Sequence, residues 1–272
     1  MPSRASTSAS RTGEASAAIC FRSRMIMVLS FEKMRKISIL FIVLAAGCAS
    51  ARKPPLAFDH VWMAVSPGAP ERTVLERAGF RIAPGVNRHE GQGTASITVE
   101  FANGFVELLW PDESVPVAPG MERVVEKFRK RAAWRTSGWC PFSLGFRRTT
   151  KEPLRLPFPT WSLTTAWLPP GAAMEMLTPR DDTTSPSLFI SPRALSDDNP
   201  TPPDAIDPRR ITGVRLIEPS AYAPIPALRF VEREHLLAVE RGPEWLVEVT
   251  LDGGRAGKVD DFRPELPLRI RR

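Results

Sequence analysis

Alternating apolar and polar residues are clearest between residues 56 and 110. The helical spacing of apolar residues over 69–78 ends at Gly79, which suits the first residue beyond a helix. Asn103-Gly104 is a two-residue hairpin signal. The apolar runs predict strands over residues 56–65, 80–82, 94–101 and 105–110. The order β-α-β-β-β buries one sheet face under one helix, so a second copy is expected to complete the core.

The later part of the chain repeats this pattern less clearly. A helix is predicted over residues 121–133, and Pro219, Pro224 and Pro226 argue against another before residue 235. The predicted strands are residues 140–148, 161–167, 173–177, 187–190, 210–217, 235–241 and 244–252, the last two forming a hairpin around Gly242-Pro243. The prediction is an α+β fold of paired βαβββ modules, whose curved, incomplete barrel-like sheet surrounds a cleft. Residues 56–110 form the first module, and 140–252 form diverged, partly degenerate further modules.

The composition supports a globular core, with 43% hydrophobic residues and many turn-forming prolines. The net charge of +7 is concentrated at the N-terminus. Residues 1–47 contain seven basic and two acidic residues, whereas residues 48–272 contain 30 basic and 28 acidic ones. The larger part is therefore nearly neutral and is not expected to bind nucleic acid. The basic cluster of residues 123–135 reads as the solvated face of an amphipathic helix.

The N-terminal region has the features of an export signal. Residues 1–33 are predicted to be unstructured or to precede the true translation start, because Met25, Met27 and Met34 are all plausible starts. From Met34 the chain reads MRKISILFIVLAAGCAS, with a basic start and about ten apolar residues, too few to span a bilayer. Residues 34–47 are therefore expected to be a signal peptide.

The small residues before Cys48 resemble the lipobox of bacterial lipoproteins. In that class the chain is cut before the cysteine, whose thiol carries a lipid, so Cys48 is the expected lipidation site and residues 48–55 the tether. Ala45 stands where Leu is favoured, which leaves ordinary secretion open; an apolar helix with a chance cysteine is the other alternative. Ala49 favours the outer over the inner membrane of the bacterial envelope. Cys140 then lacks a disulfide partner and is expected to be buried.

The residues of the first module resemble a known family. FDHVWMAV, ERAGF and GQGTASITVEFANGFVELL are similar, in order and spacing, to the glyoxalase-like branch of the vicinal oxygen chelate superfamily. The resemblance covers residues 56–110, and it identifies residues 56–272 as a glyoxalase-like domain. Any other β-α-β unit of ferredoxin-like type is the alternative.

The resemblance implies a divalent metal, such as zinc, nickel, manganese or iron, between paired modules. His60 matches the first-strand histidine and Glu107 the last-strand glutamate. In the second half Gly213 stands where a histidine is wanted, and Glu248 matches Glu107, with Glu175 as a rival. The expected metal ligands are thus His60, Glu107 and Glu248, with Glu107 and Glu248 also as catalytic carboxylates. Structural roles for His60 and Glu107, as satisfied polar groups of the cleft wall, stay open.

His89 is expected to line the mouth of the cleft, whereas His235 is expected at the surface. Three functions remain open: a metal-dependent lyase, isomerase or dioxygenase acting on a small oxygen-bearing molecule; a metal-free module that binds such a molecule; and a structural envelope lipoprotein. Enzymatic activity is therefore undecided, as are the ligand and the oligomeric state. The sequence contains no Gly-rich phosphate loop, no nucleophile elbow and no zinc-spaced cysteine pair.

Overall fold

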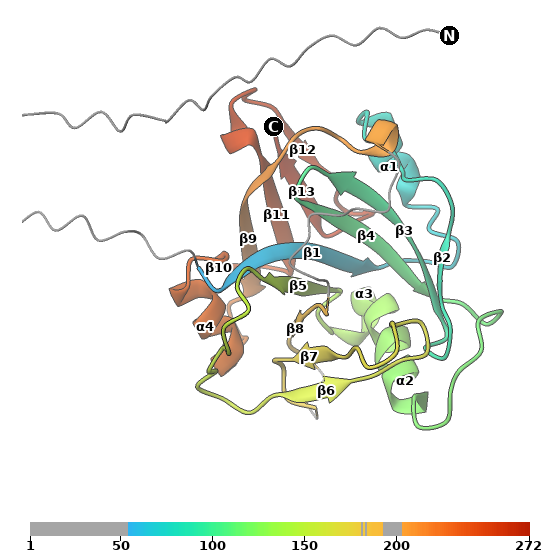
Figure 1. Cartoon of the computed structure of the whole chain (residues 1–272). Coiled ribbons are helices and arrows are strands. Elements are labelled where there is room, and N and C mark those ends of the chain that lie inside the picture. Colours follow the sequence, from blue (N-terminus) through green and yellow to red (C-terminus); the bar gives the residue numbers. More distant parts are fainter. Residues whose placement is uncertain (1–53, 181, 183, 193–202) are drawn as a thin grey trace, which may run out of the picture. The chain divides into compact units, whose positions relative to one another are not determined.

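The computed structural model describes residues 54–180, 182, 184–192 and 203–272 (Figure 1). The predicted signal peptide, Cys48 and most of the tether lie outside these residues. Within the described ranges no helix has the length and apolar character needed to cross a membrane.

The first eight strands of the chain form one sheet. Its strands lie in the order β2-β3-β4-β1-β5-β8-β7-β6. They are β1 (Leu56–Ala64), β2 (Asn87–His89), β3 (Thr94–Phe101), β4 (Gly104–Pro111), β5 (Phe142–Arg148), β6 (Trp161–Leu163), β7 (Met174–Met176) and β8 (Ser187–Ile190). The sheet is strongly curled and open, like half a barrel, so the predicted α+β class and curved sheet are confirmed.

The sheet consists of two similar halves joined at its centre. β1 pairs with β4 in parallel, β5 pairs with β8 in parallel, and β1 and β5 run antiparallel to each other. Each half thus repeats the same strand order, and the second copy consists of β5 to β8. Its strands β6 and β7 have three residues each, and the connection from β5 to β6 contains no helix.

The C-terminal residues form a separate five-stranded sheet in the order β10-β9-β11-β13-β12. Its strands are β9 (Ile211–Pro219), β10 (Ala238–Gly242), β11 (Leu246–Leu251), β12 (Val259–Asp261) and β13 (Leu268–Arg271). The predicted hairpin around Gly242-Pro243 is wrong, because β10 and β11 lie on opposite sides of β9. The helix judged to be lost is present as α4 (Pro226–Arg233). Proline is tolerated there because a residue in the first helical turn needs no backbone donor.

The remaining helices are short: α1 (Arg72–Arg77), α2 (Glu122–Ala132), α3 (Trp134–Ser137), and the 3-10 turns η1 (Pro203–Ala205) and η2 (Asp252–Gly254). Arg131 of α2 is buried and donates hydrogen bonds to the carbonyl oxygens of Cys140, at 2.5 Å, and Ser185, at 2.7 Å. These bonds hold α2 beside the eight-stranded sheet, which it approaches mainly at β4. The buried, free Cys140 agrees with its predicted structural role, and burial raises the pKa of its thiol to about 12.

One hydrophobic core joins the two sheets. Phe80 contacts Phe101 of β3 and Phe262 beyond β12, with ring centroids 6.2 and 6.0 Å apart. Phe142 of β5 packs edge-on against Trp245 at 6.0 Å. Backbone hydrogen bonds also connect β3 to the segment that leads into β9. The Ala102 N–H donates to the carbonyl oxygen of Arg209, and the Asp207 N–H donates to that of Glu100. The C-terminal sheet is thus packed against the outer side of the residues that position the site.

Candidate functional site

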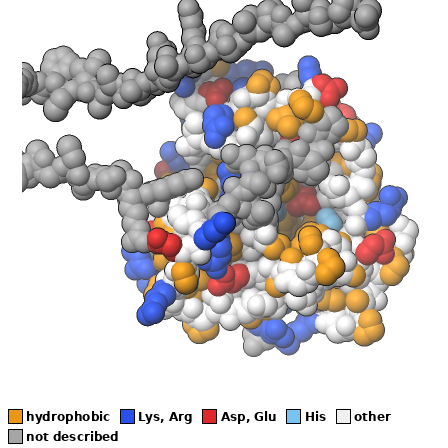
Figure 2. All heavy atoms as spheres, in the orientation of Figure 1, with side chains coloured by type: hydrophobic (Ala, Val, Ile, Leu, Met, Phe, Trp, Pro, Cys, Tyr) orange, Lys and Arg blue, Asp and Glu red, His pale blue; other side chains and the backbone are white. Residues whose placement is uncertain are grey.

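A cavity of about 1240 Å³ is bounded by the eight-stranded sheet, helix α2 and the β6–β7 connection. Figure 2 shows the hollow on the viewed face, with acidic and histidine side chains inside it beside hydrophobic ones. Its aromatic lining residues are Trp62, Phe128, Trp161, Trp167 and Phe189. Ligand pockets commonly combine such an apolar wall with a few converging polar groups. The polar lining groups include His60, His89 and Glu107.

An irregularity in β1 brings Asp59 and His60 together. Phe58 pairs with Phe146 and His60 with Gly145, so Asp59 is the extra residue of a bulge. The Nδ1 atom of His60 lies 2.8 Å from Oδ2 of the buried Asp59. Arg147 lies 3.5 Å from the other carboxylate oxygen, a contact that favours the charged form. A carboxylate oxygen accepts hydrogen bonds, and in the neutral imidazole that donates to it from Nδ1 the lone pair is on Nε2.

Gly145 gives the His60 ring the space that it occupies. A Cβ atom at residue 145 would lie 2.8 Å from Cε1 and 2.9 Å from Nδ1 of His60, and 3.0 Å from the Phe189 ring. Phe105 covers the other face of the imidazole, stacked at 4.2 Å between ring centroids. The ring is thus held between β4 and β5, with its Nε2 atom directed toward Glu107.

Glu107 lies between two imidazoles that come from different strands. Its Oε2 is 3.9 Å from Nε2 of His60, and its Oε1 is 3.7 Å from Nε2 of His89. Both separations exceed a hydrogen bond. All three side chains are 10–12% exposed, so they are largely buried but reach the cavity. The structure therefore brings the predicted His60 and Glu107 together at the cavity wall.

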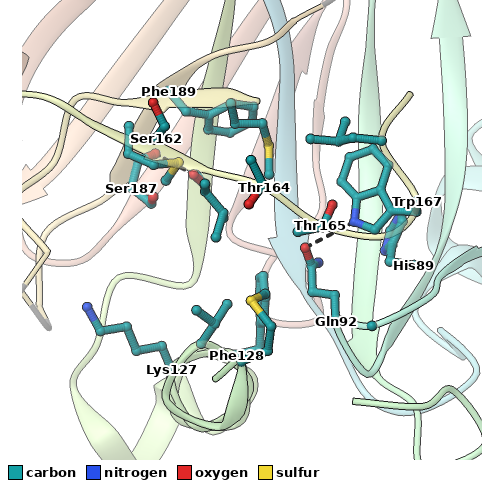
Figure 3. A pocket seen from close by; sticks show the side chains of 18 of the residues that line it. His89, Gln92, Lys127, Phe128, Ser162, Thr164, Thr165, Trp167, Ser187 and Phe189 are labelled. Atoms are coloured by element: carbon teal, nitrogen blue, oxygen red, sulfur yellow. Dashed lines mark hydrogen bonds between the residues drawn. The ribbon is translucent and has the colours of Figure 1, made fainter. Parts of the chain in front are cut away.

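His89 belongs to this group more closely than the sequence indicated. Its Nδ1 atom lies 2.9 Å from the hydroxyl of Thr94, which also accepts from Gln92 at 2.9 Å. Trp167 donates to the Gln92 side chain at 3.3 Å, as the dashed line in Figure 3 shows. Burial lowers the pKa of His89 below its usual value although the adjacent Glu107 raises it, so the ring is neutral near pH 7.

The sequence signal for β2 was weak, since residues 84–93 resemble a loop and the strand was expected at 80–82. The short β2 instead pairs with the start of β3, with His89 opposite Thr94. This pairing places His89 beside Glu107. No local sequence pattern indicated that Gln92 and Trp167 belong to the site, because the contact between them joins residues 75 positions apart.

Glu248 and its rival Glu175 do not line the cavity. Glu248 is buried in β11 and contacts Arg271, Arg269 and Arg215, at 2.7, 3.3 and 3.5 Å. Burial raises the pKa of Glu248, but the arginines outweigh it and the pKa lies below its ordinary value. Glu175 pairs with Arg148 at 2.6 Å. The expected match of Glu248 to Glu107 was therefore wrong. Glu248 belongs to the C-terminal sheet, and the strand equivalent to β4 is β8.

The second half of the eight-stranded sheet has no equivalent of the histidine and glutamate. Gly145 of β5 lies opposite His60, and the β8 residues at the cavity are Ser187 and Phe189. In the part of the chain that the structure describes, no three His, Cys, Asp or Glu side chains are placed to hold a metal ion. As arranged, His60, His89 and Glu107 therefore do not fit a metal centre, and no step is assigned to a metal.

A comparison with family models identifies the domain to which most of the eight-stranded sheet belongs. A family model described as a glyoxalase-like domain matches residues 58–207, more than half of the chain. No curated protein matches. Among solved structures, a hypothetical protein from Staphylococcus aureus is similar with a TM-score of 0.46 and 11% identity, over 79% of this chain and 98% of that one.

Proposed function

The chain belongs to the glyoxalase-like domain family of the vicinal oxygen chelate superfamily, and we propose on that premise that its cavity binds a small oxygen-bearing molecule and transfers a proton on it. One observation carries the proposal. Two imidazoles and a carboxylate from β1, β2 and β4 converge on a cavity wall, and each imidazole has its Nδ1 atom engaged by an oxygen. Such orientation of a histidine by a second group is typical of acid–base sites.

In the proposed reaction His60 is the base. Its Nε2 atom takes a proton from a carbon next to a carbonyl group, and the new imidazolium is stabilised by Asp59, 2.8 Å from Nδ1, and by Glu107. In this tautomer neutral His89 accepts a hydrogen bond from the Thr94 hydroxyl at Nδ1 and donates one from its Nε2–H to the substrate oxygen. The proton, or a solvent deuteron in its place, then returns from His60 to the same carbon. No proton or electron is gained or lost overall, so the reaction class is exchange or isomerisation.

The test measures deuterium uptake from D2O into a panel of 2-oxoaldehydes, 2-hydroxyketones and 2-oxoacids, by NMR. The full-length protein is expected to accelerate exchange at the carbon beside the carbonyl for at least one class. His60→Gln should lower the rate about 100-fold or more, the usual size of general-base catalysis. His235→Asn is the matched control, because His235 lies at an exposed turn with φ of 56° and does not line the cavity.

Equal exchange by His60→Gln and His235→Asn would contradict the proposal, as would no exchange by the unsubstituted protein on any member of the panel. Running each assay with a chelator and with added manganese, zinc or nickel separates the second candidate. That candidate is a metal-assisted enzyme, favoured by the two Nε2 atoms that flank one carboxylate. A metal-assisted reaction requires the side chains of His60, His89 and Glu107 to move closer to one another. It predicts activity only when a divalent ion is added.

We also propose that the domain is held at the bacterial envelope by a lipid on Cys48. The support is the sequence alone: the basic residues Arg35 and Lys36, the apolar stretch and the small residues before the cysteine. An outer-membrane location, indicated by Ala49, is part of the same proposal. Neither depends on the chemistry of the cavity.

A further inference from the structure

The cavity contains charged side chains that the proton-transfer proposal does not use. Apart from His60, His89 and Glu107, its charged lining residues are Arg123, Lys127, Arg131, Arg180 and Asp182. Four of these five carry a positive charge. An apolar cavity concentrates the field of such charges because its walls have a low dielectric constant. Arg131 anchors α2, so the cations left without a role are Arg123, Lys127 and Arg180, beside an apolar wall.

The positions of these cations are fixed by the surrounding backbone. The Lys127 ammonium donates to the carbonyl oxygens of Arg180 and Asp182, the latter at 3.1 Å. The Arg180 guanidinium lies over the Trp161 ring, 4.5 Å from its centroid. The Asp182 carboxylate accepts from the backbone N–H groups of Thr184 and Ser185, at 3.0 and 2.9 Å, and from the Ser185 hydroxyl. Lys127 is thus held against the backbone of residues 180 and 182, and the Arg180 guanidinium lies on the neighbouring Trp161 wall of the same cavity.

His89, one of the residues of the proposed proton transfer, lies toward another end of the cavity. In Figure 3 Lys127 and His89 lie toward opposite sides of the pocket, with Phe128 between them in the view. The apolar part of the lining includes Trp62, Met174, Met176 and Phe189. Two polar ends separated by an apolar wall match a molecule with an apolar body and a polar group at each end.

We infer that the ligand of this cavity is an amphipathic organic anion. Its acidic group is bound by Lys127 and Arg180, its apolar body lies along Phe128 and the neighbouring wall, and its reactive oxygen-bearing end meets His60 and His89. The assignment of the reactive end rests on the proposed function. The assignment of the anionic end rests on the charges and the wall alone. The volume of about 1240 Å³ exceeds the 300–1,000 Å³ of most ligand pockets, so a body longer than a three-carbon metabolite is accommodated.

The experiment measures the affinity of the full-length protein for three probes with the same ten-carbon chain, by calorimetry below their micelle concentrations. Decanoate is expected to bind, whereas decyltrimethylammonium should not, and decanol should bind about ten-fold more weakly than decanoate. Lys127→Met should weaken decanoate binding about ten-fold without changing the affinity for decanol. Added salt should weaken decanoate binding selectively, because the cations at the cavity end are partly exposed to solvent.

Lys130→Met is the matched control, because Lys130 lies on the same helix, pairs with Glu126 at 2.9 Å and does not line the cavity. Arg180→Gln is the second variant, should Lys127→Met fail to fold. Equal affinities for decanoate and decanol, or equal effects of the Lys127 and Lys130 substitutions, would overturn the inference. Selective decanoate binding by an unsubstituted protein that exchanges no deuterium would refute only the proposed function. Deuterium exchange without selective decanoate binding would refute only the anionic ligand.

Discussion

At the scale of single residues, the site depends on the absence of a side chain at Gly145. The His60 ring lies so close to this residue that a Cβ atom there would be 2.8 Å from Cε1 of the imidazole, nearer than such atoms approach in proteins. Glycine is normally unfavourable in a strand, so its presence here is explained by the close approach of the imidazole. The position of His60 is therefore determined as much by β5 as by its own strand.

Gly145→Ala is expected to push the His60 ring away from Asp59. The clash should destabilise the protein by about 1–3 kcal/mol, as overpacking of a core does. It should also lower deuterium exchange into the substrate by at least ten-fold while decanoate still binds. Gly213→Ala is the control, because a Cβ atom there lies 3.6 Å or more from its nearest neighbours and meets ordinary contacts. Identical exchange rates for the two variants would show that Gly145 does not position His60.

The sequence identified His60 and Glu107 because each lies within a recognisable strand motif. It placed His89 only at the mouth of the cleft, since no local pattern reveals a three-residue strand such as β2. Glu248 was misassigned for a physical reason. A buried glutamate in an apolar strand has the same sequence signature whether it faces a ligand or is neutralised by arginines, and Arg269 and Arg271 come from another strand.

At the scale of elements, helix α2 supplies Lys127 and Phe128 to the cavity, and Arg131 fixes it in place. The buried guanidinium bonds two carbonyl oxygens, those of Cys140 and Ser185, which lie just before the neighbouring parallel strands β5 and β8. A buried arginine is tolerated only with such partners. The position of α2 therefore depends on this one side chain as well as on its apolar face.

Arg131→Met is expected to lower the free energy of unfolding by about 2–4 kcal/mol, because it leaves two buried carbonyl oxygens without donors. Decanoate binding should weaken as well, since Lys127 lies one turn earlier on the same helix. Urea denaturation measures the first effect and calorimetry the second. Arg129→Met, which changes an exposed residue of the same helix, should alter the stability by less than about 0.5 kcal/mol. A stability of Arg131→Met equal to that of Arg129→Met would refute the anchoring role.

Element prediction succeeded where the local pattern is strong and failed where tertiary contacts decide. The apolar spacing of residues 121–133 predicted α2 to within one residue at each end. Helix α4 was missed because three nearby prolines suggested interruption, although Pro226 begins the helix. The supposed hairpin after residue 235 failed for a different reason. A Gly-Pro turn permits strands to pair, but β9 lies between β10 and β11.

At the scale of the whole described fold, the family match and the hydrophobic core end at different residues. The glyoxalase-like match ends at residue 207, whereas the core continues through β9, β11 and β13. The sequence resemblance of residues 210–217 to the opening strand suggested a further copy of the module. The true second copy was obscured because its strands are short and its helix is absent. Cooperative folding of both sheets follows from their shared core.

Phe262→Ala tests this cooperativity. Phe262 is 5% exposed and contacts Phe80, so the substitution should cost about 3–5 kcal/mol. Hydrogen exchange should show the same loss of protection in β3 as in β11, because the sheets unfold together. Val259→Ala, on the exposed side of β12, should change protection little. Loss of protection confined to residues 209–272 would mean that the C-terminal sheet unfolds independently.

The contact between Gly145 and His60 also limits what the second half of the sheet can contribute to the cavity wall. A side chain at residue 145 would have to share the space that the His60 imidazole already fills. A second imidazole could therefore be introduced there only together with a shift of His60, so the site accommodates one histidine from the two central strands.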